Sequence, residues 1–133
     1  MTDTVAYRQR IKLPYRYTTG EVNETFLEGL AAGKILGSKC EACGLTMVPA
    51  KPFCSGCSAT SGEPVEVAST GTLVTHSRRH DGAVIGLIRL DDTDTHFPHV
   101  VDAEQVETGM RLKARFAADP EPEITAIEAF EPV

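Results

Sequence analysis

The chain has 133 residues, of which 41% are hydrophobic and 24% are charged. This composition is typical of a folded globular protein and excludes general disorder. The formal net charge of -6 argues against a nucleic-acid binder, which usually presents a basic face. No apolar run reaches the length of a membrane span, and the N-terminal sequence lacks the apolar core of a signal peptide. We therefore expect a cytoplasmic protein that contacts neither membrane nor nucleic acid.

Residues 1–21 are predicted to form an extended N-terminal arm, because Pro14 and the run Thr18-Thr19-Gly20 interrupt any regular period. All the tyrosines of the chain lie on this arm: Tyr7, Tyr15 and Tyr17. Aromatic side chains gathered on a segment without a core of its own indicate packing onto a surface. That surface belongs either to a partner or to the protein's own body, and the sequence leaves both alternatives open.

The next segment, VNETFLEGLAA at residues 22–32, has the period of a helix. Phe26, Leu27 and Leu30 form an apolar stripe at helical spacing, and Gly33 is a natural end point. A helix this short is marginal in isolation, so we expect it to dock on the rest of the protein.

Residues 34–60 contain the four cysteines in two pairs, Cys40-x2-Cys43 and Cys54-x2-Cys57. Two residues between cysteines let both thiolates of a tight turn face one ion, and a hairpin between the pairs completes a tetrahedron. Gly44 and Gly56 fit the two turns, where backbone amides approach the sulfurs. Four thiolates leave no open coordination position, which predicts a structural zinc ion in a small zinc ribbon. Iron bound as in rubredoxin is the alternative that spacing alone does not exclude.

From residue 64 onward the pattern changes to short strands. PVEVAST alternates, GTLVTHSRRH forms a longer strand, and Asp81-Gly82 predicts a two-residue hairpin turn before AVIGLIRL. AVIGLIRL is nearly all apolar, as in a strand buried on both faces. The later strands are expected at HFPHVVD, RLKARF and EITAIEAFEPV. Five or six short strands without a clear helix predict a small β-barrel or sandwich.

No recognisable catalytic group of residues is apparent in the sequence. The chain has no nucleophile elbow, phosphate-binding glycine loop or His-Glu-x-x-His motif, and its cysteines are all assigned to the metal. The histidines have no metal-ligand pairing and are expected to be ordinary strand or surface residues: His76, His80, His96 and His99. The basic residues of the second half could meet phosphates or be solvated: Arg78, Arg79, Arg89, Lys113 and Arg115.

The run FLEGLAAGKILGSKCEACGLTMVPAKPFCSGCS, followed by GTLVTHSRRH, resembles the zinc-ribbon/OB-fold family known as DUF35. The resemblance extends over roughly residues 22–133, and it rests on these positions: Phe26, Leu30, Gly33, Cys40, Cys43, Gly44, Pro49, Cys54, Cys57, Gly71, Thr72, Gly109 and Met110. It implies a mainly β fold in three parts. These are the arm at 1–21, a helix with a rubredoxin-like zinc ribbon at 22–62, and a C-terminal OB-fold barrel at 63–133.

The resemblance also implies a function. Members of this family look like non-catalytic accessory subunits of thiolase-superfamily enzymes, which make or cleave C–C bonds in acyl-CoA substrates. It therefore implies a hetero-oligomer with a thiolase-like catalytic subunit, structural Zn2+, and a coenzyme A thioester bound at the interface. Two alternatives remain open, a nucleic-acid-binding zinc-ribbon/OB protein and a rubredoxin-like electron carrier.

Overall fold

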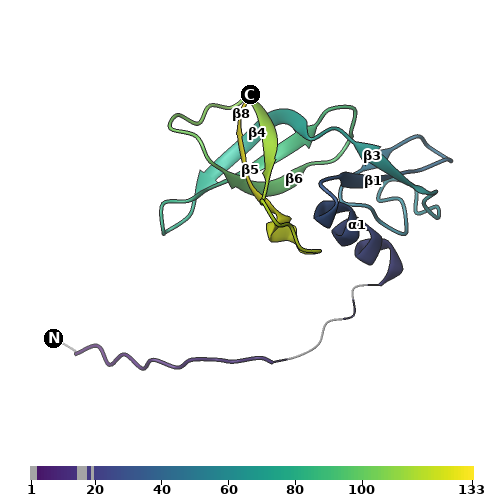
Figure 1. Ribbon diagram of the computed structural model, residues 1–133. Helices are drawn as coiled ribbons and strands as arrows, with labels where there is room; N and C mark the ends of the chain where they lie inside the picture. The colour runs from purple at the N-terminus through teal and green to yellow at the C-terminus, as the bar shows by residue number, and fades with distance from the viewer. Residues whose placement is uncertain (1–2, 15–17, 19) are drawn as a thin grey trace.

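The computed structural model describes residues 3–14, 18 and 20–133, and it places one helix, a small sheet and a barrel in chain order (Figure 1). Helix α1 (Glu21–Ala31) precedes a three-stranded sheet of order β2-β1-β3, formed by Thr46–Met47, Ile35–Lys39 and Pro64–Val67. The remaining strands close into a barrel: β4 (Thr70–Arg78), β5 (Val84–Leu90), β6 (Phe97–Val101), β7 (Arg111–Phe116) and β8 (Ile127–Pro132). The mainly β fold with an N-terminal helix, a ribbon and a barrel confirms the predicted class.

Helix α1 begins and ends one residue earlier than predicted. Its end is a Schellman motif, in which the N–H of Lys34 donates to Gly29 O at 2.8 Å and the N–H of Gly33 donates to Leu30 O at 3.0 Å. The predicted apolar stripe is the face of α1 that packs on the hydrophobic core. Phe26 and Leu30 are buried there, and Leu27 packs against the same core.

The ribbon sheet extends further along the chain than the predicted boundary at residue 62. Strand β3 begins at Pro64 and pairs antiparallel with β1, from Ile35 opposite Val67 to Ser38 opposite Pro64. The other side of β1 pairs with the two-residue strand β2. The alternating sequence PVEV therefore belongs to the ribbon sheet, and the barrel starts at β4. Sequence periodicity identified the strand but could not identify its partner.

The barrel has the strand order β4-β5-β6-β8-β7, and β7 pairs back to β4. Strands β6 and β8 run parallel, through Val101 opposite Phe130, while the other neighbours are antiparallel. A five-stranded Greek-key barrel is the OB-fold architecture. A short 3-10 turn, η1 (Ile124–Ala126), leads into β8, where the sequence predicted strand from residue 123.

Two local predictions about the barrel were wrong. Strand β5 alternates between buried and less buried residues, with Arg89 exposed, so only its inner face lies in the core. The turn after β4 is also longer than two residues, because Arg78 pairs with Val84 and residues 79–83 form the connection. The carboxylate of Asp81 accepts from the N–H of Ala83 at 3.0 Å, and this contact stabilises the longer turn.

Ribbon, helix and barrel share one hydrophobic core. Phe26 and Leu30 of α1 and Val48 of the ribbon belong to the same buried cluster as Phe97 and Phe130 of the barrel. The rings of Phe26 and Phe97 meet edge-to-face with centroids 6.3 Å apart. This continuous core explains how a helix that would be marginal alone is held in place.

Hydrogen bonds also join the outer edge of β2 to the barrel. The N–H of Thr46 donates to Asp94 Oδ2 and the N–H of Val48 donates to Thr95 Oγ1, both at 2.9 Å, and the N–H of Asp94 donates to Thr46 O at 2.9 Å. Asp94 and Thr95 lie in the loop between β5 and β6. The loop thus covers the sheet edge that β2 would otherwise expose.

The N-terminal segment at residues 3–14 is exposed, contains neither helix nor strand, and extends away from the folded body (Figure 1). Tyr7 is 92% exposed, so it does not pack on the protein's own core; Tyr15 and Tyr17 lie outside the described residues. In the described part of the chain, no helix is both long and apolar enough to cross a bilayer.

Candidate metal centre

The four cysteines lie on two turns with the same backbone pattern. In the first turn the N–H of Cys40 donates to Leu45 O and the N–H of Gly44 donates to Cys40 O, both at 2.8 Å. In the second turn the N–H of Cys54 donates to Ala59 O at 2.8 Å and the N–H of Ser58 donates to Cys54 O at 3.0 Å. The two CxxC sequences therefore fold into a repeated knuckle, each with one buried and one exposed cysteine.

The sulfur atoms converge as the spacing predicted. Cys40 Sγ lies 3.5 Å from Cys57 Sγ, Cys43 Sγ lies 3.5 Å from Cys54 Sγ, and all four lie within 4.8 Å of one another. A disulfide would require about 2.05 Å, and the four cysteines are free. Tetrahedral Zn2+ with Zn–S bonds of about 2.3 Å separates its sulfurs by about 3.8 Å. The donor set and its spacing therefore fit a closed tetrathiolate ion site.

Backbone amides prepare two of the thiols for ligation. The N–H groups of Cys57 and Gly56 lower the pKa of Cys54 to about 6, although burial opposes them. The N–H of Cys43 likewise lowers the pKa of Cys40. The N–H of Leu45 favours the Cys43 thiolate, but the neighbouring thiols of Cys54 and Cys40 outweigh it and raise the pKa of Cys43 to about 12. Thiolates are the metal-binding form, and each knuckle combines one thiol whose pKa is lowered with one whose pKa is raised.

The two knuckles differ at the residue that follows each CxxC pair. Gly44 has φ +80° and Ser58 has φ +65°, so both occupy the left-handed region. Gly56 was expected in a turn where a backbone amide approaches a sulfur, and this is confirmed, since its N–H donates to Cys54 Sγ at 3.3 Å. Sequence reasoning missed Ser58 because serine gives no conformational signal. Its offset from Cys54, which equals that of Gly44 from Cys40, could have identified it.

The metal centre has little hydrophobic core of its own. Only Cys40, Met47 and Cys54 are buried in its cluster, with Leu45 and Ala59 packed against them. Met47 Sδ also lies 3.4 Å from the backbone N of Ser55, a contact that the sequence did not reveal. A cluster of this size cannot hold the ribbon loops by apolar burial, and an ion would supply the missing folding energy.

The histidines are not gathered into a site. His76 lies on β4 opposite Gly86, and His80 and His96 are exposed in loops. His99 is half-buried on β6: its Nδ1 accepts from the N–H of Val100 at 2.9 Å, and its ring lies 5.5 Å from that of Phe130. These contacts make His99 part of the packing.

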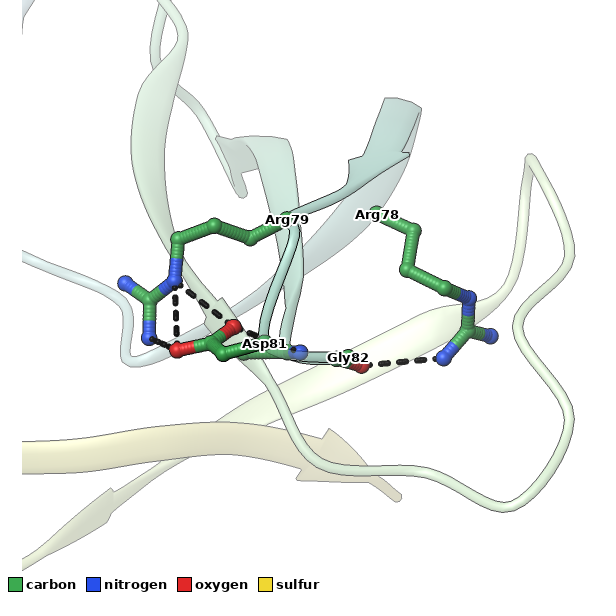
Figure 2. A network of polar contacts seen from close by, with 5 residues as sticks. Arg78, Arg79, Asp81 and Gly82 are labelled. Atoms are coloured by element: carbon green, nitrogen blue, oxygen red, sulfur yellow. Dashed lines mark hydrogen bonds and ion pairs between the residues drawn. The ribbon is translucent and has the colours of Figure 1, made fainter. Parts of the chain in front are cut away.

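Three of the six basic residues of the barrel strands and their hairpin are paired with carboxylates: Arg79, Arg111 and Arg115. Figure 2 shows Arg79 and Asp81 facing one another at the tip of the β4–β5 hairpin, while Arg78 reaches to the carbonyl of Gly82. Arg79 Nη2 lies 2.6 Å from Asp81 Oδ2, and the Arg79 guanidinium lowers the pKa of Asp81 to about 2. Arg111 binds both oxygens of Asp91, at 2.7 and 2.6 Å. Arg78 and Arg89 instead donate to backbone carbonyls, those of Gly82 and Thr93, and have no carboxylate partner in the described part of the chain.

Arg115 lies among three carboxylates, with its guanidinium 3.1 Å from Asp102, 2.9 Å from Glu131 and 3.5 Å from Glu128. This cluster connects β7 and β8 to the end of β6, and its surplus of negative charge would repel a phosphate group.

Comparison with known proteins supports the reading of the ribbon. Residues 27–61 match the family model described as ChsH2, rubredoxin-like zinc ribbon domain. Over most of its length the chain is similar in fold to a crystal structure of a DUF35-family protein of unknown function from Sulfolobus solfataricus. The two share 22% identity with a TM-score of 0.68, and the match covers 86% of this chain and 87% of that one.

A second solved structure of similar fold is the Ltp2-ChsH2(DUF35) aldolase. Identity is 18% and the TM-score is 0.65, and the match covers 88% of this chain and 98% of that one. No curated protein matches the sequence. These findings confirm the resemblance to DUF35 drawn from the sequence motifs, with a ChsH2-type zinc ribbon between residues 27 and 61.

Proposed function

We propose that this chain is a zinc-containing, non-catalytic accessory subunit of a thiolase-superfamily enzyme that makes or cleaves C–C bonds in acyl-CoA substrates. The observation that carries the proposal is the fold likeness to a chain of the Ltp2-ChsH2(DUF35) aldolase, over 98% of that chain. A DUF35 chain there forms part of an enzyme assembly, and the same ribbon type occurs here at residues 27–61. The catalytic cysteine of the reaction would belong to the partner.

In this proposal Cys40, Cys43, Cys54 and Cys57 hold one structural Zn2+. The tetrathiolate set leaves no position for water or substrate, so the ion would fix the ribbon rather than take part in the reaction. The ribbon and barrel share a core, and they would therefore present one continuous surface to the partner. A coenzyme A thioester would lie at that interface, held mainly by the catalytic subunit.

The two alternatives receive less support from the contacts. A single-strand binder needs a basic groove and stacking aromatics, whereas Arg79, Arg111 and Arg115 are paired with carboxylates. A rubredoxin-like carrier requires iron in the tetrathiolate site, which metal analysis and visible absorption would detect.

The test is to express the chain alone and together with the thiolase-like protein encoded nearest to it. Each peak from size-exclusion chromatography is analysed for metal and for acyl-CoA activity. One zinc per chain, co-elution, and activity only in the joint peak are expected. Separate elution together with full activity of the enzyme alone would contradict the proposal.

A variant Phe53→Ala serves as a matched control in the co-elution experiment. Phe53 is 60% exposed on the ribbon and belongs to no core cluster, so its removal tests surface contact without unfolding the chain. Cys57→Ser tests whether binding of the partner depends on the metal site. It removes one ligand and should reduce both zinc content and co-elution.

A further inference from the structure

The N-terminal arm carries exposed apolar side chains that the folded body does not use. Val5, Tyr7, Ile11 and Leu13 are between 69% and 92% exposed. Large side chains gathered in this way on a segment without its own structure are a mark of an interaction site. The sequence left open whether the arm packs on its own body, and for Val5, Tyr7, Ile11 and Leu13 the structure shows that it does not.

The arm has the period of a β-strand with two chemically different faces. From residue 5 to residue 13 the odd positions are apolar, except for Gln9, and the even positions from residue 8 are Arg8, Arg10 and Lys12. Successive side chains of an extended chain point to opposite sides. A strand formed here would therefore present an apolar face and a basic face, and its nine residues would span about 30 Å.

The charge of the arm is opposite to that of the body. Residues 1–20 contain four basic residues and one acidic residue, a formal charge of +3, so residues 21–133 carry -9 of the total of -6. A phosphate-rich partner, whether nucleic acid or anionic membrane, would attract the arm but repel the body. The aliphatic side chains gain free energy only where an apolar groove covers them. Together these facts favour a protein receptor.

The described part of this chain offers no sheet edge suited to the arm. The barrel is closed, and Asp94 and Thr95 cover the edge of β2. The free edge of β3 is four residues long, starts at Pro64, which has no N–H, and carries the exposed Glu66. Short length, proline and charge are the features by which natural edges avoid pairing. The receptor for a nine-residue strand is therefore to be sought on a different protein.

We infer that residues 5–13 dock in extended form, as an added strand, into an apolar groove bordered by carboxylates on the thiolase-like subunit. This inference rests on the proposed function and specifies how the partner is held. The apolar face fills the groove and the basic face meets the carboxylates. The backbone pairs with a sheet edge of the partner, as in other cases of strand addition.

The decisive variant exchanges neighbouring residues and leaves composition and charge unchanged. Arg10→Ile, Ile11→Arg, Lys12→Leu and Leu13→Lys together move two apolar side chains to the basic face. If the alternation matters, affinity for the thiolase-like subunit should fall by about 100-fold, as expected when hot-spot side chains are lost. Arg8→Gln, Arg10→Gln and Lys12→Gln together should mainly slow association and weaken its salt dependence.

Binding is measured by calorimetry with the full-length chain at two salt concentrations, and folding of each variant is checked by thermal unfolding. Because the arm does not contact the core, the Tm of the free chain should not change. Binding of the exchanged variant within twofold of the parent would overturn the inference. The inference would equally fail if light scattering showed that the arm instead drives self-association of the chain. It would also fail if the arm bound a single-stranded oligonucleotide or anionic vesicles.

The two proposals fail in different ways. If the chain with its arm deleted binds the thiolase-like subunit as tightly as the full chain does, only the strand-docking inference is wrong. If the full-length chain does not bind that subunit at all, the accessory-subunit proposal is wrong and the docking inference falls with it.

Discussion

Phe26 of helix α1 packs into the core that the helix and ribbon share with the barrel, and replacing it tests whether these parts are one cooperative unit. Phe26 is 3% exposed and its ring meets Phe97 edge-to-face at 6.3 Å. Phe→Ala in a core costs about 3–5 kcal/mol, of which the aromatic pair accounts for about 0.5–1.5 kcal/mol. We expect Phe26→Ala to destabilise the protein by about 3–4 kcal/mol.

The assay is urea unfolding, followed separately by circular dichroism and by zinc release to a chromophoric chelator. The two transitions should coincide in the parent chain and shift together to lower urea in Phe26→Ala, because the helix, ribbon and barrel share a core. Phe53→Ala is the matched control: with 60% of the side chain exposed, its effect should stay within about 0.5 kcal/mol. Equal effects of the two substitutions, or an unshifted barrel transition in Phe26→Ala, would refute the reasoning.

Three further predictions follow from single contacts. Cys57→Ser should abolish stoichiometric zinc, measured by plasma emission spectrometry, because three thiolates hold the ion less tightly; retention of one zinc would contradict the assignment. Gly71→Ala should lower Tm by several degrees, because a Cβ there would lie 2.5 Å from Arg89 O. Arg111 lowers the pKa of Asp91 from 3.8 to about 2, so this pair stabilises the fold above pH 4 and the stabilisation is lost as the pH falls toward 2. Arg111→Gln should flatten that part of the stability–pH curve.

Several features of the fold were predictable because they depend on local chemistry. The CxxC pairs identified four sulfurs that converge to within 4.8 Å, since the spacing itself sets the turn geometry. The stripe of Phe26 and Leu30 identified the buried face of α1, and Gly33 marked its end. Strand β7 was predicted with its exact bounds at residues 111–116, because its neighbours on both sides contain clear turn residues.

Other features depend on which segments meet in space. Strand β3 has the same alternation as the barrel strands, and only its pairing with β1 assigns it to the ribbon sheet. Strand β5 was expected to be buried on both faces, but closure of the barrel leaves its outer face uncovered. Ser58 adopts φ +65° because the second knuckle repeats the first, and no intrinsic preference of serine predicts it.

The sequence by itself determined the metal ligands proposed here, the order of helix, ribbon and barrel, and the two-faced pattern of the arm, because each depends on residues close together in the chain. Only the tertiary structure decided that helix α1, the ribbon and the barrel share a core, in which Phe26 meets Phe97, and that Tyr7 and Leu13 remain uncovered by the body. The physical reason is that packing and exposure depend on which distant surfaces meet, and residue spacing carries no information about that.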